Sequence, residues 1–327
     1  MKRIVVFGAT GGVGAYFIKY ATGHLDRNEY EIIPVGRRQT GFFESYGLKY
    51  YSVDISNSND FMVLPEEDVH AVILLAAQIP TNMLDYDPSK YVFSNIVGTF
   101  NVLEYCKRVK IDRLLFTTSI SDSLCESEQE LDERYPHKQK YVGDHAMYAI
   151  SKNCGVEMIE HYFQEYGIKR FVFRLPTIYY YSPDCYWNSG GIRKIRPLYK
   201  FIELAEKGAP IELWGDKNSI KEMVHVYDLS QMLCNALMAK SEGGFFNVGN
   251  GFTITLEQEI ETIIDIFSKQ NQRSSIIYRP EIPSKKEFIM KFDNAIRFLD
   301  YKPWYDCERL MQNIKEEKCN YSFAGLY

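Results

Sequence analysis

The sequence has no paired cysteine motif, no excess of basic residues and no long apolar run. Its seven cysteines are scattered without any C-x-x-C spacing, so we expect reduced thiols and no metal site. The net charge of −5 argues against a nucleic-acid-binding surface. No apolar stretch is long enough to span a membrane, and Met-Lys-Arg-Ile leads straight into a strand-like run without room for a signal peptide. These absences predict a cytoplasmic protein with neither a membrane nor a nucleic-acid partner.

Within the 327 residues, the first 175 alternate short apolar runs with helix-like stretches. Strands that are apolar throughout and separated by helices indicate a parallel sheet covered on both faces. The expected fold class is therefore α/β, with a doubly wound parallel sheet of the Rossmann type. The strands are expected at Arg3–Phe7, Glu31–Val35, Ala71–Leu75, Arg113–Thr118 and Arg170–Leu175, and the helices near 12–24, 90–109 and 147–166. Beyond residue 176 the alternation stops, and no flexible linker marks a boundary.

Three glycines stand three residues apart where the first strand gives way to a helix. Gly8 allows the tight turn, Gly11 lets the backbone approach a ligand, and Gly14 lets the helix pack closely on the strand. The free N–H groups and the positive dipole at the helix start attract a diphosphate, so a dinucleotide is the expected ligand. Glycines cluster in many loops, but the strand before them and the helix after them strengthen this prediction. The expected cofactor turn is completed by Thr10, Gly12 and Val13.

Arg37 and Arg38 follow Gly36 at the end of the second expected strand. A carboxylate normally holds the adenine ribose 2′-hydroxyl here, whereas a guanidinium attracts a 2′-phosphate. Glycine at the acid position favours NADP over NAD as the cofactor, although two arginines can also be ordinary solvated loop charges. Further candidates for the cofactor cleft are Asp54 and Ile55, against the adenine, and Ala76 and Ala77, whose small side chains would admit the ribose or simply pack.

Tyr148 and Lys152 are four residues apart on the helix expected at 147–166, so they lie one turn from each other. An enzyme that oxidises alcohols needs a group to take the hydroxyl proton, and tyrosine can do so only if its pKa, roughly 10 in isolation, is lowered. A neighbouring ammonium favours the phenolate. Tyr86 and Lys90 have the same spacing, but Pro88 between them makes a continuous helix improbable.

Ser119 stands at the carboxyl end of the fifth expected strand, where ligands of open parallel sheets bind. A serine there can hydrogen-bond a reacting oxygen and hold it beside the phenol. A strand-terminal serine can equally satisfy backbone groups. Gln78 and Ser121 follow the ends of the fourth and fifth strands and are candidate substrate contacts.

The glycine turn, Ser119 and the pair of Tyr148 and Lys152 together resemble the extended short-chain dehydrogenase/reductase family, the nucleotide-sugar-modifying epimerase/dehydratase type. The likeness continues at Asn95–Glu104, Arg174–Tyr179, Val224–Asp228 and Phe246–Gly249. The resemblance implies a nicotinamide cofactor, a nucleotide-sugar substrate and a homodimer paired through the helices near 90–109 and 147–166. It also implies a smaller C-terminal α/β substrate domain, here 176–222 with 251–327, beside a dinucleotide domain of 1–175 with about 223–250.

The same resemblance implies roles for residues of the second half. Pro176 lies in the segment expected to pass the nicotinamide, and a substrate diphosphate could be met by Arg193, Lys194, Arg196 and Lys221. The aromatic side chains gathered in this region would stack on a base or sugar, or simply pack in the core: Tyr179, Tyr180, Tyr181, Tyr186 and Trp187. Lysine stands at 221 where many relatives have arginine, which keeps the charge and loses the bidentate fork. His225 is expected to be structural, and Asp228 to cap a helix beginning at Leu229.

The reaction class is narrowed by the residues after Ser119. The family's dehydratases have an acidic pair there, whereas this chain has Ile120 and Ser121, with Asp122 one position too late. Dehydration is disfavoured, and the usual tyrosine-glycine pair is replaced by Leu124 and Cys125. Epimerisation of a nucleotide sugar is the leading hypothesis. The alternatives are NADPH-dependent reduction of a keto-sugar or small carbonyl compound, and a non-catalytic sensor that binds NADP.

Overall fold

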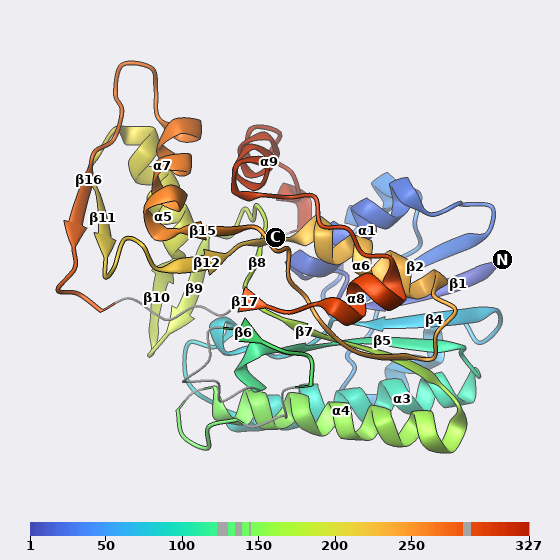
Figure 1. Cartoon of the computed structure of the whole chain (residues 1–327). Helices are drawn as coiled ribbons and strands as arrows, with labels where there is room; N and C mark the ends of the chain where they lie inside the picture. The colour runs from blue at the N-terminus through green and yellow to red at the C-terminus, as the bar shows by residue number, and fades with distance from the viewer. Residues whose placement is uncertain (123–129, 135–138, 144, 284–288, 327) are drawn as a thin grey trace.

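The computed structural model describes residues 1–122, 130–134, 139–143, 145–283 and 289–326. Its centre is a parallel sheet of seven strands in the order β14-β7-β5-β4-β1-β2-β3. The strands are β1 (Lys2–Phe7), β2 (Tyr30–Gly36), β3 (Tyr51–Ser52), β4 (Val69–Leu74), β5 (Arg113–Ser119), β7 (Lys169–Leu175) and β14 (Gly243–Asn247). Helices lie on both faces of this sheet (Figure 1). The prediction of a doubly wound α/β fold is confirmed.

The register of the sheet brings the carboxyl ends of the central strands to one edge. Phe7 of β1 pairs with Leu74 of β4, and Leu74 pairs with Phe116 of β5. At the end of β5, Ser119 pairs with Leu175 of β7. The strands are apolar because both faces are covered, and their side chains are almost fully buried. Loops that follow these strands therefore meet at one edge.

Each face of the sheet has its own apolar core. In Figure 1, α1 (Gly12–His24), α6 (Val226–Met238) and α8 (Asp293–Leu299) cover one face, and α3 (Gly98–Arg108) and α4 (Ala146–Tyr166) cover the other. The predicted range 12–24 matches α1, and α4 begins one residue before the predicted range and ends with it. Gly167 closes α4 with a φ of 69°, the left-handed conformation that glycine adopts readily.

The single helix expected over 90–109 is instead three consecutive segments. Asp87 caps α2 (Pro88–Tyr91), a π-helical stretch, η4 (Val92–Val97), follows, and α3 completes the run. Pro88 is tolerated in the first turn of α2 because the missing N–H would have no helical partner there. A π-turn admits one extra residue into a helix and redirects side chains locally. The turn at η4 contains the buried Asn95.

Parts of the irregular second half of the sequence form a smaller lobe, at the left of Figure 1. Its core joins apolar residues of α5 (Pro197–Lys207), α7 (Leu256–Phe267) and α9 (Cys307–Cys319). Short two-stranded sheets complete it: β9 (Tyr186–Ser189) with β10 (Ile192–Ile195), β11 (Ile211–Trp214) with β16 (Ile276–Arg279), and β12 (Ile220–Glu222) with β15 (Thr253–Thr255). Two further pairs, β8 (Ile178–Tyr179) with β13 (Val224–His225) and β6 (Glu130–Leu131) with β17 (Ile289–Met290), lie beside the main sheet. The remaining short segments are η1 (Phe42–Tyr46), η2 (Ser58–Val63), η3 (Pro80–Asn82), η5 (Ile120–Asp122) and η6 (Ala324–Leu326).

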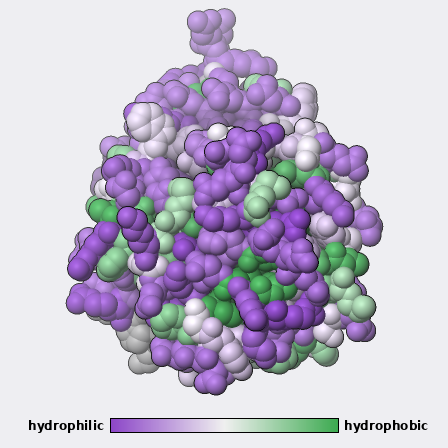
Figure 2. Space-filling model, turned by 90° about the vertical axis from the view of Figure 1, so that its right-hand side faces the viewer, coloured by the Kyte–Doolittle hydropathy of each residue, from purple (hydrophilic) through white to green (hydrophobic). Residues whose placement is uncertain are grey.

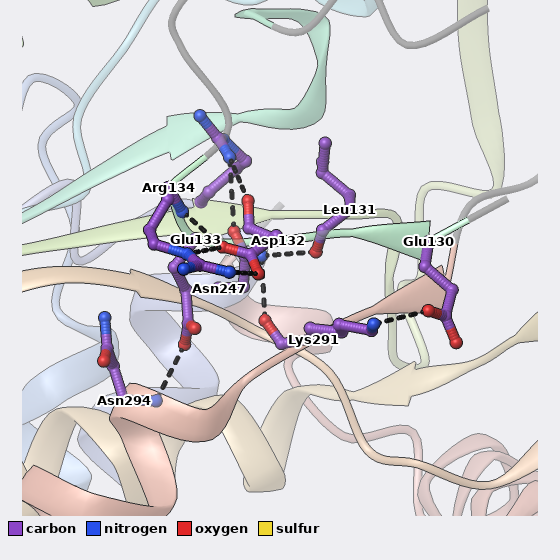
Figure 3. Close-up of polar contacts among 9 residues, drawn as sticks. Glu130, Leu131, Asp132, Glu133, Arg134, Asn247, Lys291 and Asn294 are labelled. Atoms are coloured by element: carbon purple, nitrogen blue, oxygen red, sulfur yellow. Dashed lines mark hydrogen bonds and ion pairs between the residues drawn. The ribbon is translucent and has the colours of Figure 1, made fainter. Parts of the chain in front are cut away.

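Asn247, the last residue of β14, ties the main sheet to the β6–β17 pair (Figure 3). Its amide nitrogen donates to the carbonyls of Leu131, at 2.8 Å, and of Lys291, at 2.9 Å. Next to this contact, the half-buried carboxylate of Glu133 accepts a 3.0 Å hydrogen bond from the backbone N–H of Asn294. Burial raises the pKa of Glu133 to about 7.

The face shown in Figure 2 is mostly hydrophilic, with apolar residues gathered in small patches. Among the helices of the part of the chain that the structure describes, none is long and apolar enough to cross a membrane.

Candidate active site

A cleft of about 970 Å³ opens at the carboxyl edge of the main sheet. One side is formed by the glycine turn between β1 and α1 and by the ends of β4, β5 and β7. Residues that follow β8 and residues of the β9–β10 hairpin form the other. Ligands of open α/β sheets bind at this edge, and the volume is at the upper end of the range for small-molecule sites.

The glycine turn is tightly built. Gly8 has a φ of 91°, and a Cβ added to it would lie 2.5 Å from the backbone nitrogen of Ala76. A Cβ on Gly14 would lie 2.2 Å from the carbonyl oxygen of Gly8. Gly8 thus makes the sharp turn and Gly14 permits the close packing of α1, as the spacing predicts. Gly11 precedes the first helical residue, and no side chain of the described residues caps the start of α1.

The turn fits the diphosphate of a dinucleotide. The uncapped N–H groups at the start of α1 and the helix dipole favour an anion there, and the glycines leave the backbone bare. The structure brings every predicted cofactor residue to the cleft wall: Gly8, Thr10, Gly11, Gly12, Val13, Gly14, Arg37, Arg38, Asp54, Ile55, Ala76, Ala77, Tyr148, Lys152 and Pro176. The candidate cofactor site is therefore contiguous.

Gly36 and Arg38 shape the adenine end of the cleft. A Cβ on Gly36 would lie 2.8 Å from Oγ1 of Thr10 and 3.0 Å from the hydroxyl of Tyr50, so a longer acidic side chain is not accommodated without rearrangement. Arg38 lines the cleft and donates a 2.9 Å hydrogen bond to the carbonyl of Thr10. The guanidinium is thus held against the glycine turn.

Tyr148 and Lys152 lie on successive turns of α4 and both face the cleft. Lys152 is only 3% exposed, and its Nζ lies 3.8 Å from the centre of the Phe116 ring. Burial lowers the pKa of Lys152 to about 7, because a charged ammonium is poorly solvated there. Both protonation states are therefore accessible near neutral pH. The competing Tyr86 lies before the start of α2 at Pro88, so the second tyrosine–lysine pair is not on one helix, as predicted.

Ser119, the last residue of β5, lines the same cleft. Its Oγ accepts a hydrogen bond from the backbone N–H of Ser121 and lies 3.2 Å from the Ser121 hydroxyl. Ser121, a predicted substrate contact, lies in η5 and is not among the described residues that line the cleft; it contacts Ser119 instead. Leu124 and Cys125 lie outside the described residues.

Asn95 connects two walls of the cleft. In the sequence it stood out only as the first residue of the family-like segment Asn95–Glu104. Its side chain accepts a 2.7 Å hydrogen bond from the backbone N–H of Gln78 and donates to the Gln78 carbonyl at 3.0 Å. It also donates to the hydroxyl of Ser151, 2.9 Å away, which in turn donates to the carbonyl of Tyr148. Asn95 therefore holds Gln78, a cleft residue as predicted, in a fixed position relative to α4.

Of the predicted diphosphate contacts, Arg193 and Arg196 line the cleft, whereas Lys194 and Lys221 are not among the described residues that do. Arg193 makes a 3.1 Å ion pair with Asp184, another cleft residue. Lys221 is buried in the lobe, where its Nζ lies 3.0 Å from the buried carboxylate of Glu259. The prediction that Lys221 meets a substrate diphosphate was therefore wrong, because its ammonium is paired with Glu259 inside the lobe.

His225 has the structural environment that was predicted. It is fully buried, its Nε2 lies 3.0 Å from the Asn313 side chain, and burial lowers its pKa to about 3. The prediction for Asp228 was wrong, because α6 begins at Val226 and His225 caps it through the N–H of Tyr227. The Asp228 carboxylate instead accepts from backbone N–H groups of the segment before α9.

Several cleft residues escaped the motif-based prediction. Those after β4 are Thr81, Asn82 and Leu84, and those from the lobe are Ser182, Asp184 and Asn188. The aromatic residues Tyr180, Tyr186 and Trp187 line the cleft as expected, whereas no sequence pattern pointed to the polar lobe residues. The loop after β4 has no motif.

The chain matches the model of the NAD dependent epimerase/dehydratase family over residues 4–249, and it belongs to that family. This confirms the resemblance to extended short-chain dehydrogenases/reductases. Among known proteins, a putative UDP-glucose 4-epimerase from Methanocaldococcus jannaschii is 26% identical over 270 residues, which cover 82% of each chain.

Two solved structures show the same fold. UDP-glucose 4-epimerase from Thermotoga maritima, solved with UDP-glucose, has a TM-score of 0.76 at 20% identity, covering 98% of this chain and 99% of that one. UDP-glucuronic acid 4-epimerase from Bacillus cereus, solved with UDP-glucuronic acid and NAD, has a TM-score of 0.72 at 20% identity, covering 96% of this chain and 99% of that one.

Proposed function

We propose that this chain epimerises a nucleotide-activated sugar with the help of a nicotinamide dinucleotide, and that NADP serves better than NAD. The observation that carries the proposal is a single cleft lined by the glycine turn together with Ser119, Tyr148 and Lys152. Membership of the epimerase/dehydratase family and the epimerases among its relatives support the same reaction.

When bound, the nicotinamide supplies the acceptor that holds a hydride and returns it. The chain's own residues handle the proton. The phenolate of Tyr148 takes the proton from the sugar hydroxyl as the carbonyl forms, and returns it after the sugar has presented its other face. The Lys152 ammonium favours the phenolate, while Ser119 hydrogen-bonds the same sugar oxygen and orients it.

Residues 1–175 with about 223–250 would hold the dinucleotide, and 176–222 with 251–327 the sugar nucleotide. In support, β14 adds to the main sheet beside β7, and the apolar side chains of α6 join the same core as α1. The β9–β10 hairpin, by contrast, forms the opposite wall of the cleft.

A homodimer through α3 and α4 remains part of the proposal. The exposed Phe93, Phe100 and Tyr166 on η4, α3 and α4 support it, because large apolar side chains often gather where subunits pair. Light scattering on the purified protein measures the oligomeric state directly.

Incubation with UDP-glucose, UDP-glucuronic acid or UDP-N-acetylglucosamine and a catalytic amount of dinucleotide tests the reaction by NMR. We expect inversion at one sugar carbon with no net change in the dinucleotide. Tyr148→Phe should reduce the rate by about 10²–10⁴-fold, the usual contribution of an acid–base group, with dinucleotide affinity nearly unchanged. Stoichiometric consumption of NADPH would indicate a reductase, and an active Tyr148→Phe enzyme would refute the assignment.

The cofactor preference rests on Gly36, Arg37 and Arg38. Calorimetric titration should give a lower Kd for NADP than for NAD, and Arg38→Gln should reduce the difference by about tenfold, since it removes a charged partner of the 2′-phosphate. Solved epimerases from Bacillus cereus and Thermus thermophilus contain NAD, so equal or tighter NAD binding would place this chain with them.

A further inference from the structure

Tyr180, which follows β8, lies directly against the glycine turn. A Cβ built on Gly12 would lie 2.4 Å from Cε2 and Oη of Tyr180 and 2.5 Å from Cζ. Side chains do not approach so closely, so the phenol ring occupies the space that any side chain at position 12 would need. The backbone itself does not require glycine there, because Gly12 has no positive φ. Glycine at position 12 therefore leaves room for the Tyr180 ring in this position.

The position of Tyr180 is fixed by its neighbours. Its carbonyl accepts a 2.8 Å hydrogen bond from the hydroxyl of Tyr199, and the same hydroxyl accepts a 2.6 Å hydrogen bond from the N–H of Ser182. The Tyr180 ring also packs at 5.4 Å from the ring of Tyr16 on α1. Both the backbone and the ring of Tyr180 are thus held in place next to the start of α1.

Arg196 contacts the Tyr180 side chain and lines the same cleft. Burial works to lower the pKa of Arg196, but its contacts with Tyr180, together with the nearby Tyr199 and Asp184, outweigh this, and the pKa is raised. Its Nε donates to the carbonyl of Tyr186 at 3.3 Å. A guanidinium only donates hydrogen bonds, so Tyr180 accepts from it and its own hydroxyl hydrogen can be donated to another acceptor.

We propose that Tyr180 binds the diphosphate of the dinucleotide beside the glycine turn, with Arg196 as the residue that positions its hydroxyl. This inference rests on the dinucleotide of the proposed function. The hydroxyl lies beside the first residue of α1, where N–H groups and the helix dipole attract a diphosphate. A phenol that donates to an anionic oxygen forms a strong, charge-assisted hydrogen bond. Tyr180 thereby serves the cofactor rather than stacking on the sugar or base.

The first experiment compares ADP with adenosine by calorimetry on the full-length protein. Tyr180→Phe should weaken ADP and NADP binding by about tenfold, the effect of a lost hydrogen bond to a charged group, and leave adenosine binding unchanged. Tyr186→Phe is the matched control, because Tyr186 lines the cleft but does not touch Gly12, and it should leave ADP binding unchanged. Unchanged ADP affinity in Tyr180→Phe overturns the inference.

A second arm separates the diphosphate of the cofactor from that of the substrate. If Tyr180→Phe weakens UDP binding and leaves ADP binding intact, Tyr180 belongs to the sugar nucleotide and the inference is overturned. If the wild-type protein binds neither ADP nor NADP, the proposed function is refuted. If the wild type is active but Tyr180→Phe binds ADP as tightly as the wild type does, only this inference is refuted.

Paired substitutions test the contact of Tyr180 with Gly12 and Arg196. Gly12→Ala should weaken ADP binding, because its methyl group displaces the phenol, and should have no further effect in a Tyr180→Gly background. Arg196→Gln should weaken ADP binding in the wild type and have no further effect in Tyr180→Phe. Thermal unfolding checks that each variant is folded. Additive effects of either pair in folded variants would contradict the inference.

Discussion

A lysine is buried both in the cleft wall on α4 and in the interior of the lobe, but only the lysine in the lobe has a carboxylate partner among the described residues. Lys152 is 3% exposed against the face of Phe116, and no carboxylate of the described residues pairs with it. Lys221 is 7% exposed and forms an ion pair with the equally buried Glu259. A buried charge without a counter-charge is costly, so its retention indicates a use other than stability. The comparison separates a buried lysine that lines the cleft without a carboxylate partner from one that is neutralised by an ion pair.

The largest expected effect comes from breaking the matched pair. Lys221→Met leaves the Glu259 carboxylate buried alone, which should lower the free energy of unfolding by about 3–5 kcal/mol. Chemical denaturation at pH 7 measures it. Replacing both residues, Lys221→Met with Glu259→Leu, removes both charges and should restore most of the stability. If Lys221→Met alone is as stable as the wild type, Lys221 does not neutralise a buried Glu259 carboxylate.

The same substitution at the other lysine should have the opposite sign. The pKa of Lys152 is lowered in the folded protein from its usual 10.5 to about 7, so folding opposes its protonation. The cost of the buried charge is complete below pH 7 and disappears as the pH rises toward 10.5. Lys152→Met should therefore stabilise the protein by about 2–4 kcal/mol at pH 6, with a smaller gain at pH 9, while turnover is lost.

Thermal unfolding of Lys152→Met at pH 6 and pH 9, beside the wild type, measures this dependence. A gain in melting temperature that is equal at both values would contradict the lowered pKa. Destabilisation at both would show that the Lys152 ammonium contributes to the fold, and the contrast with Lys221 would be lost.

A smaller effect is expected from Glu133, a half-buried carboxylate near the β6–β17 pair (Figure 3). Burial raises its pKa from 4.5 to about 7, so the folded state holds a proton that the unfolded state releases, and stability falls as the pH rises from about 4.5 to 7. Glu133→Gln should remove this dependence and stabilise the protein at pH 8 by about 1 kcal/mol, allowing for solvent screening.

Asp132 provides the control for Glu133. A hydrogen bond from Arg134 lowers its pKa to about 2, so Asp132→Asn should slightly destabilise the protein at pH 8. Denaturation curves of the two variants at pH 5 and pH 8 test the pair. Equal responses of both variants to pH would show that neither carboxyl is perturbed as described.

Local patterns were sufficient to predict the elements that lie close to the glycine turn. The bounds of α1, the ends of the central strands and the placement of Tyr148 and Lys152 on one helix follow from glycine spacing, apolar runs and helical periodicity. Each depends on residues within one or two turns of each other. The candidate cofactor residues follow from these elements, since parallel strands bring their ends together.

Contacts between distant segments were not predictable in the same way. Tyr180 meets Gly12 across the whole first half of the chain, and Lys221 meets Glu259 only because β12 and α7 pack in the lobe. Asp228 shows the same limit: the preference of aspartate for helix caps is a local property, whereas the N–H groups that donate to this carboxylate belong to the distant segment before α9. Local sequence patterns do not show which of several distant partners a side chain will contact in the folded protein.

The strand order has a consequence for synthesis of the chain. The outer neighbour of β7 is β14, and it is translated some seventy residues later than the strand that it covers. Until Gly243–Asn247 leave the ribosome, one border of the nascent sheet is unprotected, and exposed borders of this kind invite pairing with other chains. The edge of β7 in the partly synthesised chain is therefore covered only after β14 has been translated.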